Sequence, residues 1–287
     1  MSATPVLNVF AARAALAGTR TVLAADWLEV WTPGQWREYS GPLVGRVANL
    51  LQALAIRLSP LATGHSRRTQ DGILGSGLPA GRFLRSPGLV PEMDQVTPRL
   101  GVAAEPGPVL FVGRHIQDKR VETIPPALAL ARRDQPGLRA VIGGSGPETD
   151  AVKRAARAAG VEDAVSFPGF VAEDELARMM GEASCLLNPS RREGYGLVVV
   201  EAAAHGTPSI VTAHPANAST ELIAEGVNGF VAASASPEDL AEAIGRVHAG
   251  GEALRRSTRA WYEDAIRTRT IARTAQGILD ALEKRRR

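Results

Sequence analysis

Two carboxylates, Glu193 and Glu201, lie eight positions apart and enclose a Gly-Tyr-Gly turn and an apolar run. The turn at 194–196 follows the apolar segment 183–187 and precedes the helix-compatible segment 197–205, which predicts a strand, a loop and a helix. A loop that ends at a helix N-terminus offers a phosphate unpaired N–H groups and the positive end of the helix dipole. The two glutamates could then accept hydrogen bonds from hydroxyl groups on either side of that phosphate, as in a nucleotide-sugar. The same spacing also fits an ordinary strand-to-helix turn with two surface glutamates.

Three further groups of residues with phosphate-binding or ligand-binding character follow predicted strands. They are Gly113-Arg114, Gly144-Ser145-Gly146 and Gly169-Phe170. Ligands of parallel α/β sheets bind at the carboxyl ends of the strands. We therefore expect these groups to converge with Glu193-Gly194 at one edge of a sheet.

The elements that must position these residues alternate regularly from residue 108 onward. Strands are predicted at 109–113, 140–143, 165–167, 183–187, 209–212 and 229–231, and helices at 121–133, 148–159, 173–180, 197–205 and 237–247. Repeated strand–helix units of this length predict an α/β domain with a parallel sheet covered by helices on both faces.

The first hundred residues predict only part of a second domain. Strands are expected at 21–25 and 61–64, with a helix at 43–58 and a short one at 69–75, which makes too small a sheet to stand alone comfortably. The segment 85–108 is rich in Pro, Gly and polar residues, as linkers are, and 252–284 predicts two helices broken near 267–270. We therefore expect a partial domain over 1–90, a linker over 91–107, a complete domain over 108–266 and a C-terminal helix over 267–287 that could pack back on the N-terminal domain.

The composition excludes several classes of protein. The chain of 287 residues is 45% hydrophobic and 22% charged, as soluble globular proteins are. The net charge of +3 comes partly from the last four residues and does not argue for nucleic acid. The single cysteine, Cys185, excludes an internal disulfide framework and a cysteine-built metal site, and we expect it to be buried. No apolar run approaches the ~18–20 residues that span a bilayer, and the apolar segment 5–17 lacks a basic start and contains Arg13, unlike a signal peptide.

These motifs resemble those of glycosyltransferase family 4, a family of retaining enzymes with the GT-B fold. Its donor domain carries a Gly-Arg…Lys element, a Gly-x-Gly-Pro turn and a Glu-Gly-Phe/Tyr-Gly…Glu signature. This chain has Gly113-Arg114 with Lys119, Gly144-Ser145-Gly146-Pro147, and Glu193-Gly194-Tyr195-Gly196 with Glu201, in the same order and spacing from about 109 to 231. The resemblance therefore implies a GT-B fold with a complete Rossmann-like donor domain and a partial Rossmann-like acceptor domain.

The resemblance also implies roles for individual residues. Arg114 and Lys119 would neutralise the donor diphosphate, and Glu193 would contact the transferred sugar. These three are the expected catalytic residues, and Glu201 would hold the ribose hydroxyl groups. The expected donor-binding residues are Gly113, Gly144, Gly146, Phe170, Val171, Gly194, Tyr195, Gly196, Leu197 and Glu201. The donor would be a UDP- or GDP-sugar, with no cofactor and no metal, and the acceptor stays unidentified.

The N-terminal part departs from the family pattern. The family's strand that ends in His-Asp corresponds here to Ala25-Asp26, so the histidine position holds alanine. His65, His115 and His205 are poor substitutes: we expect His65 to be structural, whereas His115 could face the cleft. Either the true start lies upstream or the protein is N-terminally shortened, and in the second case it could be a non-catalytic nucleotide-sugar-binding remnant.

A dinucleotide-dependent oxidoreductase built around 144–146 is a further alternative. That fingerprint requires an acidic residue about 20 positions beyond the glycines, at the end of the next strand. The next predicted strand ends at Phe167-Pro168-Gly169 without a carboxylate, which argues against this alternative.

Aromatic residues gather near the start of the chain. Trp27, Trp31 and Trp36 lie within ten residues, with Tyr39 nearby. Aromatic rings stack on sugars and lie at membrane interfaces, so this segment could contact a glycolipid or a carbohydrate acceptor. A local aromatic cluster under a loop is the alternative.

The helix at 43–58 carries too few basic residues to predict a basic membrane-binding face. The basic C-terminal tail could favour anionic lipid or be merely solvated. We expect a cytoplasmic protein that could be peripheral at the inner face of the membrane.

Overall fold

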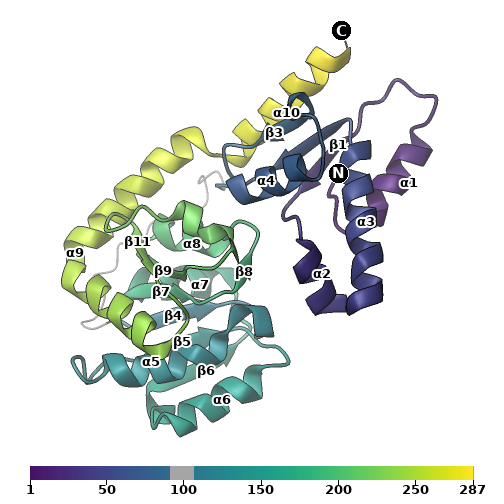
Figure 1. Ribbon diagram of the computed structural model, residues 1–287. Coiled ribbons are helices and arrows are strands. Elements are labelled where there is room, and N and C mark those ends of the chain that lie inside the picture. The colour runs from purple at the N-terminus through teal and green to yellow at the C-terminus, as the bar shows by residue number, and fades with distance from the viewer. Residues whose placement is uncertain (91–106, 287) are drawn as a thin grey trace. The chain divides into compact units, whose positions relative to one another are not determined.

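The computed structural model describes residues 1–90 and 107–286, and the chain divides into two compact units (Figure 1). Unit 1 comprises Met1–Glu92 with Thr268–Arg287, and unit 2 comprises Met93–Arg267. The predicted linker at 91–107 lies, apart from its last residue, outside the described residues.

Unit 2 contains a six-stranded parallel sheet in the order β11-β9-β7-β4-β5-β6. Its strands are β4 (Val109–Val112), β5 (Ala140–Gly143), β6 (Val165–Gly169), β7 (Cys185–Asn188), β9 (Ser209–Thr212) and β11 (Gly229–Ala232). The chain enters at the central strand β4, winds outward through β5 and β6, and returns to pair β7 on the other side of β4. The point between β4 and β7 is therefore the topological switch point, where ligands of such sheets bind.

Helices cover both faces of this sheet. They are α5 (Ile124–Ala131), α6 (Thr149–Ala158), α7 (Glu173–Glu182), α8 (Leu197–Ala204) and α9 (Pro237–Thr268). The helix predicted at 121–133 begins instead as a 3-10 turn, η3 (Val121–Thr123), followed by α5 with proline in its first turn. Proline fits there because the first N–H groups of a helix have no intrahelical partner. The core between helices and sheet includes Phe111, Leu128 and Ile142.

The long helix α9 joins two helices that the sequence predicts separately. Gly251 lies inside it with φ 48° and ψ −140°, which are not helical angles, so α9 consists of two helices that meet at a kink, in agreement with the sequence-based prediction. The break predicted near 267–270 separates α9 from α10 (Ile271–Arg286). Helix α10 belongs to unit 1, where the Val90 N–H donates to Arg269 O (3.0 Å) and the Ile271 N–H donates to Val90 O (3.1 Å).

Unit 1 is built on a three-stranded parallel sheet in the order β1-β2-β3. Its elements are α1 (Leu7–Ala15), β1 (Ala24–Trp27), α2 (Pro33–Ser40), α3 (Pro42–Leu58), β2 (Leu61–Gly64), α4 (Arg67–Gly75) and β3 (Phe83–Arg85). Residues 1–3 lie parallel beside β1, because Ala3 N–H donates to Asp26 O and Asp26 N–H donates to Met1 O, both at 2.8 Å.

The sequence-based prediction of unit 1 was less complete than that of unit 2. The strand expected at 21–25 lies three residues later, and α1, α2 and β3 were not predicted. Helix α2 does carry a local signal, since Thr32 and Gln35 form a capping box with Pro33 at the first helical position. Among the described residues, no helix is both long enough and apolar enough to span a membrane.

Candidate functional site

An ion pair between two predicted catalytic residues lies at the carboxyl edge of the unit 2 sheet. The Lys119 Nζ lies 2.6 Å from the Glu193 Oε2, and both side chains are largely buried. Lys119 ends the 3-10 turn η2 (Gln117–Lys119) after β4, and Glu193 lies in the short strand β8 (Arg192–Glu193) after β7. Asn188 Nδ2 also approaches Glu193 Oε2, at 3.5 Å. Because β4 and β7 are neighbours, residues 74 positions apart in the sequence meet at the switch point.

Asp118 holds these two loops together, a role that the sequence-based analysis missed. Its carboxylate accepts a hydrogen bond from Arg191 Nη2 (2.9 Å) and lies 3.4 Å from Arg192 Nη1. The Arg191 N–H also donates to the Asp118 carbonyl oxygen at 2.8 Å. The signal available in the sequence was the Asp-Lys pair at 118–119 and the Arg-Arg-Glu run at 191–193. These contacts place Lys119 and Glu193 opposite each other.

Arg114 follows β4 on the same edge. Its side chain is exposed, and among the described residues its guanidinium forms no ion pair. Gly113 before it is tied to the neighbouring strand, since its N–H donates to Gly143 O at 3.1 Å. The backbone at this position is therefore fixed, while the cationic group is available to an anionic ligand.

The predicted turn at 144–146 serves mainly as a structural junction. The Gly144 N–H donates to Gly169 O (2.7 Å), and the Gly146 N–H donates to Thr149 Oγ1 (3.0 Å). At Gly144, φ is +104° and an added Cβ would lie 2.0 Å from Gly113 O, so no other residue fits without a shift of the backbone. The turn thus holds the strand ends beside Gly113 and Arg114, and two of its N–H groups are already used.

His115 does not face the ligand side, contrary to one of the options weighed above. The residue is fully buried, and its Nδ1 lies 2.9 Å from Thr149 Oγ1. Burial lowers the pKa of His115, and a backbone hydrogen bond with Gly143 opposes that shift. The ring is therefore part of the structure under the 113–115 loop. His205 is likewise buried, with its pKa lowered by burial and by the charges of Arg259 and Arg255.

Helix α8 begins at this edge with a glycine cap. Gly196 has φ +102°, and no side chain caps the helix. An added Cβ at Gly196 would lie 2.6 Å from Ser219 Cβ. The first N–H groups of a helix have no intrahelical partner. In α8 the helix begins at Leu197, whose side chain is exposed. Gly194 is half-buried and Tyr195 is buried, so the backbone of the turn is what the site presents.

Glu201 lies one turn into α8 and is half-buried. Burial raises the pKa of its carboxyl group, and the negative charge of Glu173 raises it further. Among the described residues the Glu201 carboxylate has no hydrogen-bond or ion-pair partner. A partly buried acceptor without a partner is suited to hydroxyl groups of a ligand.

Two predicted donor-binding residues follow β6. Phe170 is 92% exposed, which is unusual for a large aromatic residue, and Val171 is half-buried. Gly169, with φ +74°, turns the chain out of the sheet just before them. The structure leaves both residues accessible at the carboxyl end of the strand.

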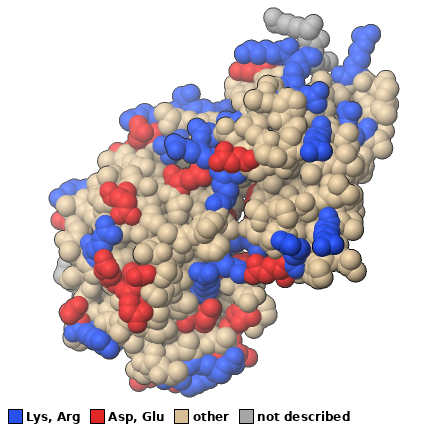
Figure 2. Space-filling view, in the orientation of Figure 1, with Lys and Arg blue, Asp and Glu red and all other residues tan. Residues whose placement is uncertain are grey.

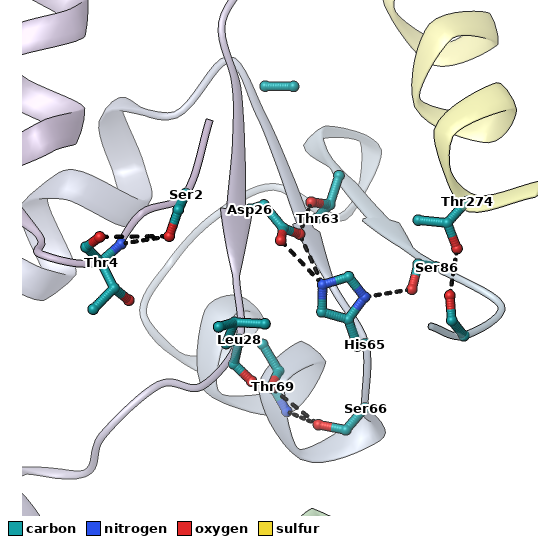
Figure 3. A network of polar contacts seen from close by, with 12 residues as sticks. Ser2, Thr4, Asp26, Leu28, Thr63, His65, Ser66, Thr69, Ser86 and Thr274 are labelled. Carbon is teal, nitrogen blue, oxygen red and sulfur yellow. Dashed lines mark hydrogen bonds and ion pairs between the residues drawn. The ribbon is translucent and has the colours of Figure 1, made fainter. Parts of the chain in front are cut away.

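Unit 1 has its own polar network at the carboxyl ends of its three strands (Figure 3). The His65 Nε2 lies 3.0 Å from Asp26 Oδ1, and its Nδ1 lies 2.7 Å from Ser86 Oγ. Thr63 Oγ1 also donates to Asp26 Oδ1. An ionised carboxylate only accepts, so His65 Nε2–H donates to Asp26, while Nδ1 pairs with the Ser86 hydroxyl. Both ring nitrogens are thus engaged, and the His65 side chain is 2% exposed, which fits the structural role predicted for it.

The pKa of Asp26 is lowered overall by this network. Burial of the carboxyl group would raise its pKa, but the hydrogen bonds from His65 and Thr63 and the charge of His65 outweigh burial. A third of the Asp26 side chain stays exposed.

The aromatic segment forms a local cluster, the alternative considered above. Trp31 packs against Trp36 (ring centroids 4.7 Å apart) and against Tyr39 (5.0 Å). Trp27 is only 2% exposed and belongs to the core of unit 1. The prediction that Trp27 could contact an acceptor was therefore wrong, because its place in β1 points its ring into the core.

Residues 94–264 match the family described as "Glycosyl transferases group 1". The chain belongs to this family. It is 35% identical over 144 residues to glycogen synthase of Mycobacterium tuberculosis, which covers 50% of this chain and 33% of that protein. It is 33% identical over 157 residues to the D-inositol 3-phosphate glycosyltransferase of Streptomyces griseus, which covers 52% of this chain and 33% of the relative. The match thus spans about one third of the length of these relatives.

The fold of this group 1 family member is that of GT-B glycosyltransferases. The crystal structure of Anabaena HepE in complex with UDP matches it with a TM-score of 0.75 at 21% identity, over 97% of this chain and 76% of HepE. HepE has also been solved in complex with UDP-glucose. The α/β fold and the family predicted from the sequence are confirmed.

In the part of the chain that the structure describes, no group of three or more His, Cys, Asp or Glu side chains is placed to hold a metal ion. Cys185 is fully buried in β7, and burial raises the pKa of its thiol to about 12. This thiol is therefore inert, as expected.

Proposed function

We propose that unit 2 binds a nucleotide-diphosphate sugar and that the chain is a retaining glycosyltransferase that uses it as donor. The observation that carries this proposal is the Lys119–Glu193 ion pair at the switch point, with the free cation of Arg114 on the same edge. Membership of the group 1 family supports the same conclusion.

The donor's diphosphate is assigned to the cationic side of this edge. Arg114 offers a planar fork of donors and Lys119 a compact charge, and the N–H groups that begin α8 after Gly194–Gly196 add a third source of positive potential. When the sugar leaves, negative charge develops on the diphosphate, and fixed cations in a partly buried site stabilise that charge. Donor activation therefore depends on Arg114 and Lys119.

Glu193 is assigned to the transferred sugar. Its carboxylate orients the Lys119 ammonium before the donor arrives and can accept hydrogen bonds from sugar hydroxyl groups. Glu201 is assigned to the ribose hydroxyl groups, because its carboxylate is half-buried and has no described partner. Phe170 and Val171 are assigned to the base, at the accessible end of β6.

The nucleotide is proposed to be UDP or GDP. The complexes of HepE with UDP and with UDP-glucose favour UDP. The acceptor stays unassigned.

The second candidate is a nucleotide-sugar-binding protein without transferase activity. Two observations favour it: Ala25 stands at the family's histidine position, and His65, directly after the neighbouring strand β2, has both ring nitrogens engaged. Every donor-site residue is shared with the first candidate.

The test is calorimetric titration of the chain with UDP, GDP and ADP, followed by the matching nucleotide-sugars. We expect saturable binding of one nucleotide diphosphate and loss of that binding in Arg114→Ala, with Arg139→Ala, on the amino side of β5, as a matched control. Failure of the folded protein to bind any nucleotide would refute the donor site. Binding without release of nucleotide from the sugar, in the presence of diverse acceptors, would favour the second candidate.

A further inference from the structure

Helix α3 of unit 1 carries an apolar face that its own domain does not cover. Its opposite face is buried and includes Gln52, Ala55 and Ile56. The large residues pointing outward are Leu43 (75% exposed), Val44 (62%), Val47 (57%), Leu50 (67%), Leu54 (44%) and Leu58 (39%). Most of them recur three or four positions apart, so they form one continuous stripe along the 17-residue helix. We call this stripe the α3 apolar face.

The exposure of so many large apolar side chains on one face of a helix indicates a contact surface. Single apolar residues on a surface are common, but a contiguous apolar patch on a folded domain marks a site of interaction. In Figure 2 the surface over α3 is predominantly uncharged, with blue basic side chains scattered within it.

The charges on helix α3 itself have one sign, because its charged residues are Arg46 and Arg57, whereas the neighbouring helix α2 carries the exposed Glu38 beside Arg37. From Tyr39 to Gln70 the sequence contains four arginines and no Asp or Glu. On the helix, Arg46 flanks the stripe and Arg57 directly precedes Leu58, the last residue of the stripe. Arg57 is held by a hydrogen bond from its Nε to Ser76 O (2.8 Å), whereas Arg46 has no ion-pair partner among the described residues.

Beside the face lies a hollow lined by two arginines. Pro33, Arg37, Gly45, Arg46 and Asn49 enclose a volume of about 240 Å³ between α2 and α3. The two helices approach closely because Gly45 has no side chain: a Cβ there would lie 2.6 Å from Trp36 O. Arg37 Nε donates to Pro33 O (3.3 Å), which turns its guanidinium along α2, and no described residue forms an ion pair with it.

We propose that the α3 apolar face and the Arg37–Arg46 hollow form a docking surface for a bilayer that contains anionic phospholipids. An interfacial helix of this kind buries an apolar face at the boundary between headgroups and acyl chains, while basic side chains bind lipid phosphates. The combination of exposed leucines, exposed arginines and a helix α3 without Asp or Glu fits that partner better than a second copy of this chain. A copy would have to place Arg37 and Arg46 against identical positive charges or exclude them from its interface.

The test is flotation of the full chain with vesicles of phosphatidylcholine alone and of phosphatidylcholine with 30% phosphatidylglycerol. We expect binding to the anionic vesicles that weakens as salt screens the arginines. The double variant Leu50→Gln/Leu54→Gln should lower the vesicle partition coefficient about tenfold or more, because it removes two large apolar side chains from the face that would enter the bilayer. The double variant Arg37→Gln/Arg46→Gln should bind both kinds of vesicle equally.

Matched controls lie on α10, where Leu279 is 54% exposed and Arg273 is exposed. Leu279→Gln and Arg273→Gln should bind vesicles like the parent chain. All substituted positions are exposed, so the circular dichroism spectrum and the thermal unfolding transition of each variant should match those of the parent chain.

The proposal is overturned if the parent chain does not bind anionic vesicles, or if the Leu50/Leu54 variant binds them as the parent does. A concentration-dependent dimer that the same variant abolishes, without lipid binding, would identify a second copy as the partner instead. None of these results depends on nucleotide binding by unit 2.

Discussion

At the residue scale, the candidate donor site combines two carboxylates in different electrostatic states. Glu193 is neutralised by Lys119 at 2.6 Å, whereas Glu201 is half-buried, has no described partner and has its pKa raised by burial and by Glu173. The two assignments therefore predict different responses to substitution and to pH.

For Glu201, we predict that nucleotide affinity depends on pH at the acidic side of neutrality. The ionised carboxylate accepts the stronger hydrogen bonds, and its folded-state pKa lies above the ordinary 4.5. Affinity for UDP should thus fall as pH decreases through that raised pKa, earlier than an ordinary glutamate would lose its charge. Glu201→Gln should bind more weakly at pH 7.5, by about 1.5–3 kcal/mol, and should lose the part of the pH dependence that the Glu201 carboxyl group contributes. Calorimetry of both proteins from pH 7.5 down to the ordinary glutamate pKa of 4.5 measures both effects, and equal pH profiles for the two proteins over that range would contradict the assignment.

The role proposed for Glu193 is tested by the substitution Glu193→Ala. Its loss removes the sugar contact and releases the Lys119 ammonium, so affinity for the nucleotide-sugar should decrease while affinity for bare UDP is unchanged or increases. The comparison of both ligands on the same variant is the measurement. Parallel losses for the two ligands would show that Glu193 acts on the nucleotide or on folding instead.

At the element scale, the carboxyl ends of the strands carry the sites of both units. In unit 2 the ends of β5 and β6 are locked by the Gly144 N–H bond to Gly169 O, which supports the loop that carries Arg114. In unit 1 the ends of β1, β2 and β3 are joined through Asp26, His65 and Ser86 (Figure 3). We expect each of these two sets of hydrogen bonds between strand ends to stabilise the folded protein.

Gly144→Ala should destabilise the protein strongly. The added methyl group would lie 2.0 Å from Gly113 O in a region of positive φ, so we expect a loss of roughly 3 kcal/mol or more. Gly160→Ala is the control, because Gly160 also has positive φ (+68°) but nothing within 4 Å of its added Cβ; it should cost about 1–2 kcal/mol. Urea unfolding measures the loss of unfolding free energy in each variant. Similar losses would mean that the backbone shifts easily to relieve the contact between the added methyl group at position 144 and Gly113 O.

Asp26→Asn should reduce stability at neutral pH by about 1–2 kcal/mol, a hydrogen-bond value discounted for the exposed third of the side chain. The pKa of Asp26 is lower in the folded state than the ordinary 3.8. Its contribution is therefore fully present above pH 3.8 and is lost as pH falls through the lowered pKa. Urea midpoints of parent and variant should differ at pH 7 and 5, and the difference should decrease as the pH is lowered below 3.8. A difference that stays constant at every pH would exclude ionisation of Asp26 as its cause.

At the scale of the whole molecule, the two units divide the assigned tasks. All of the proposed donor contacts lie in Met93–Arg267, and the proposed membrane surface lies in unit 1. Nucleotide binding should accordingly slow amide exchange at the β4, β7 and α8 edges of unit 2. Hydrogen exchange with saturating UDP measures this, and α3 serves as the internal control. Protection confined to unit 1 would contradict the assignment of the donor site.

Local sequence patterns predicted the parallel sheet of unit 2, the succession of its strands along the chain and the residues that follow those strands at the carboxyl edge. These features follow from local apolar periodicity and from glycine-rich turns, which are readable over a few consecutive residues. The elements of unit 1 were harder to predict, because short strands such as β3 contain too few residues to show a periodic pattern of apolar residues.

The pairing of side chains could not be predicted from the sequence and is known from the fold. The fold paired Lys119 with Glu193 and placed Asp118 between their loops, because partners so far apart in sequence depend on which strands become neighbours. It buried His115 and Trp27, two residues whose sequence contexts allowed an exposed role. It also decided which face of α3 is covered: that helix is apolar nearly all round, so its composition does not distinguish the face that packs on the sheet from the face that remains in contact with the surroundings.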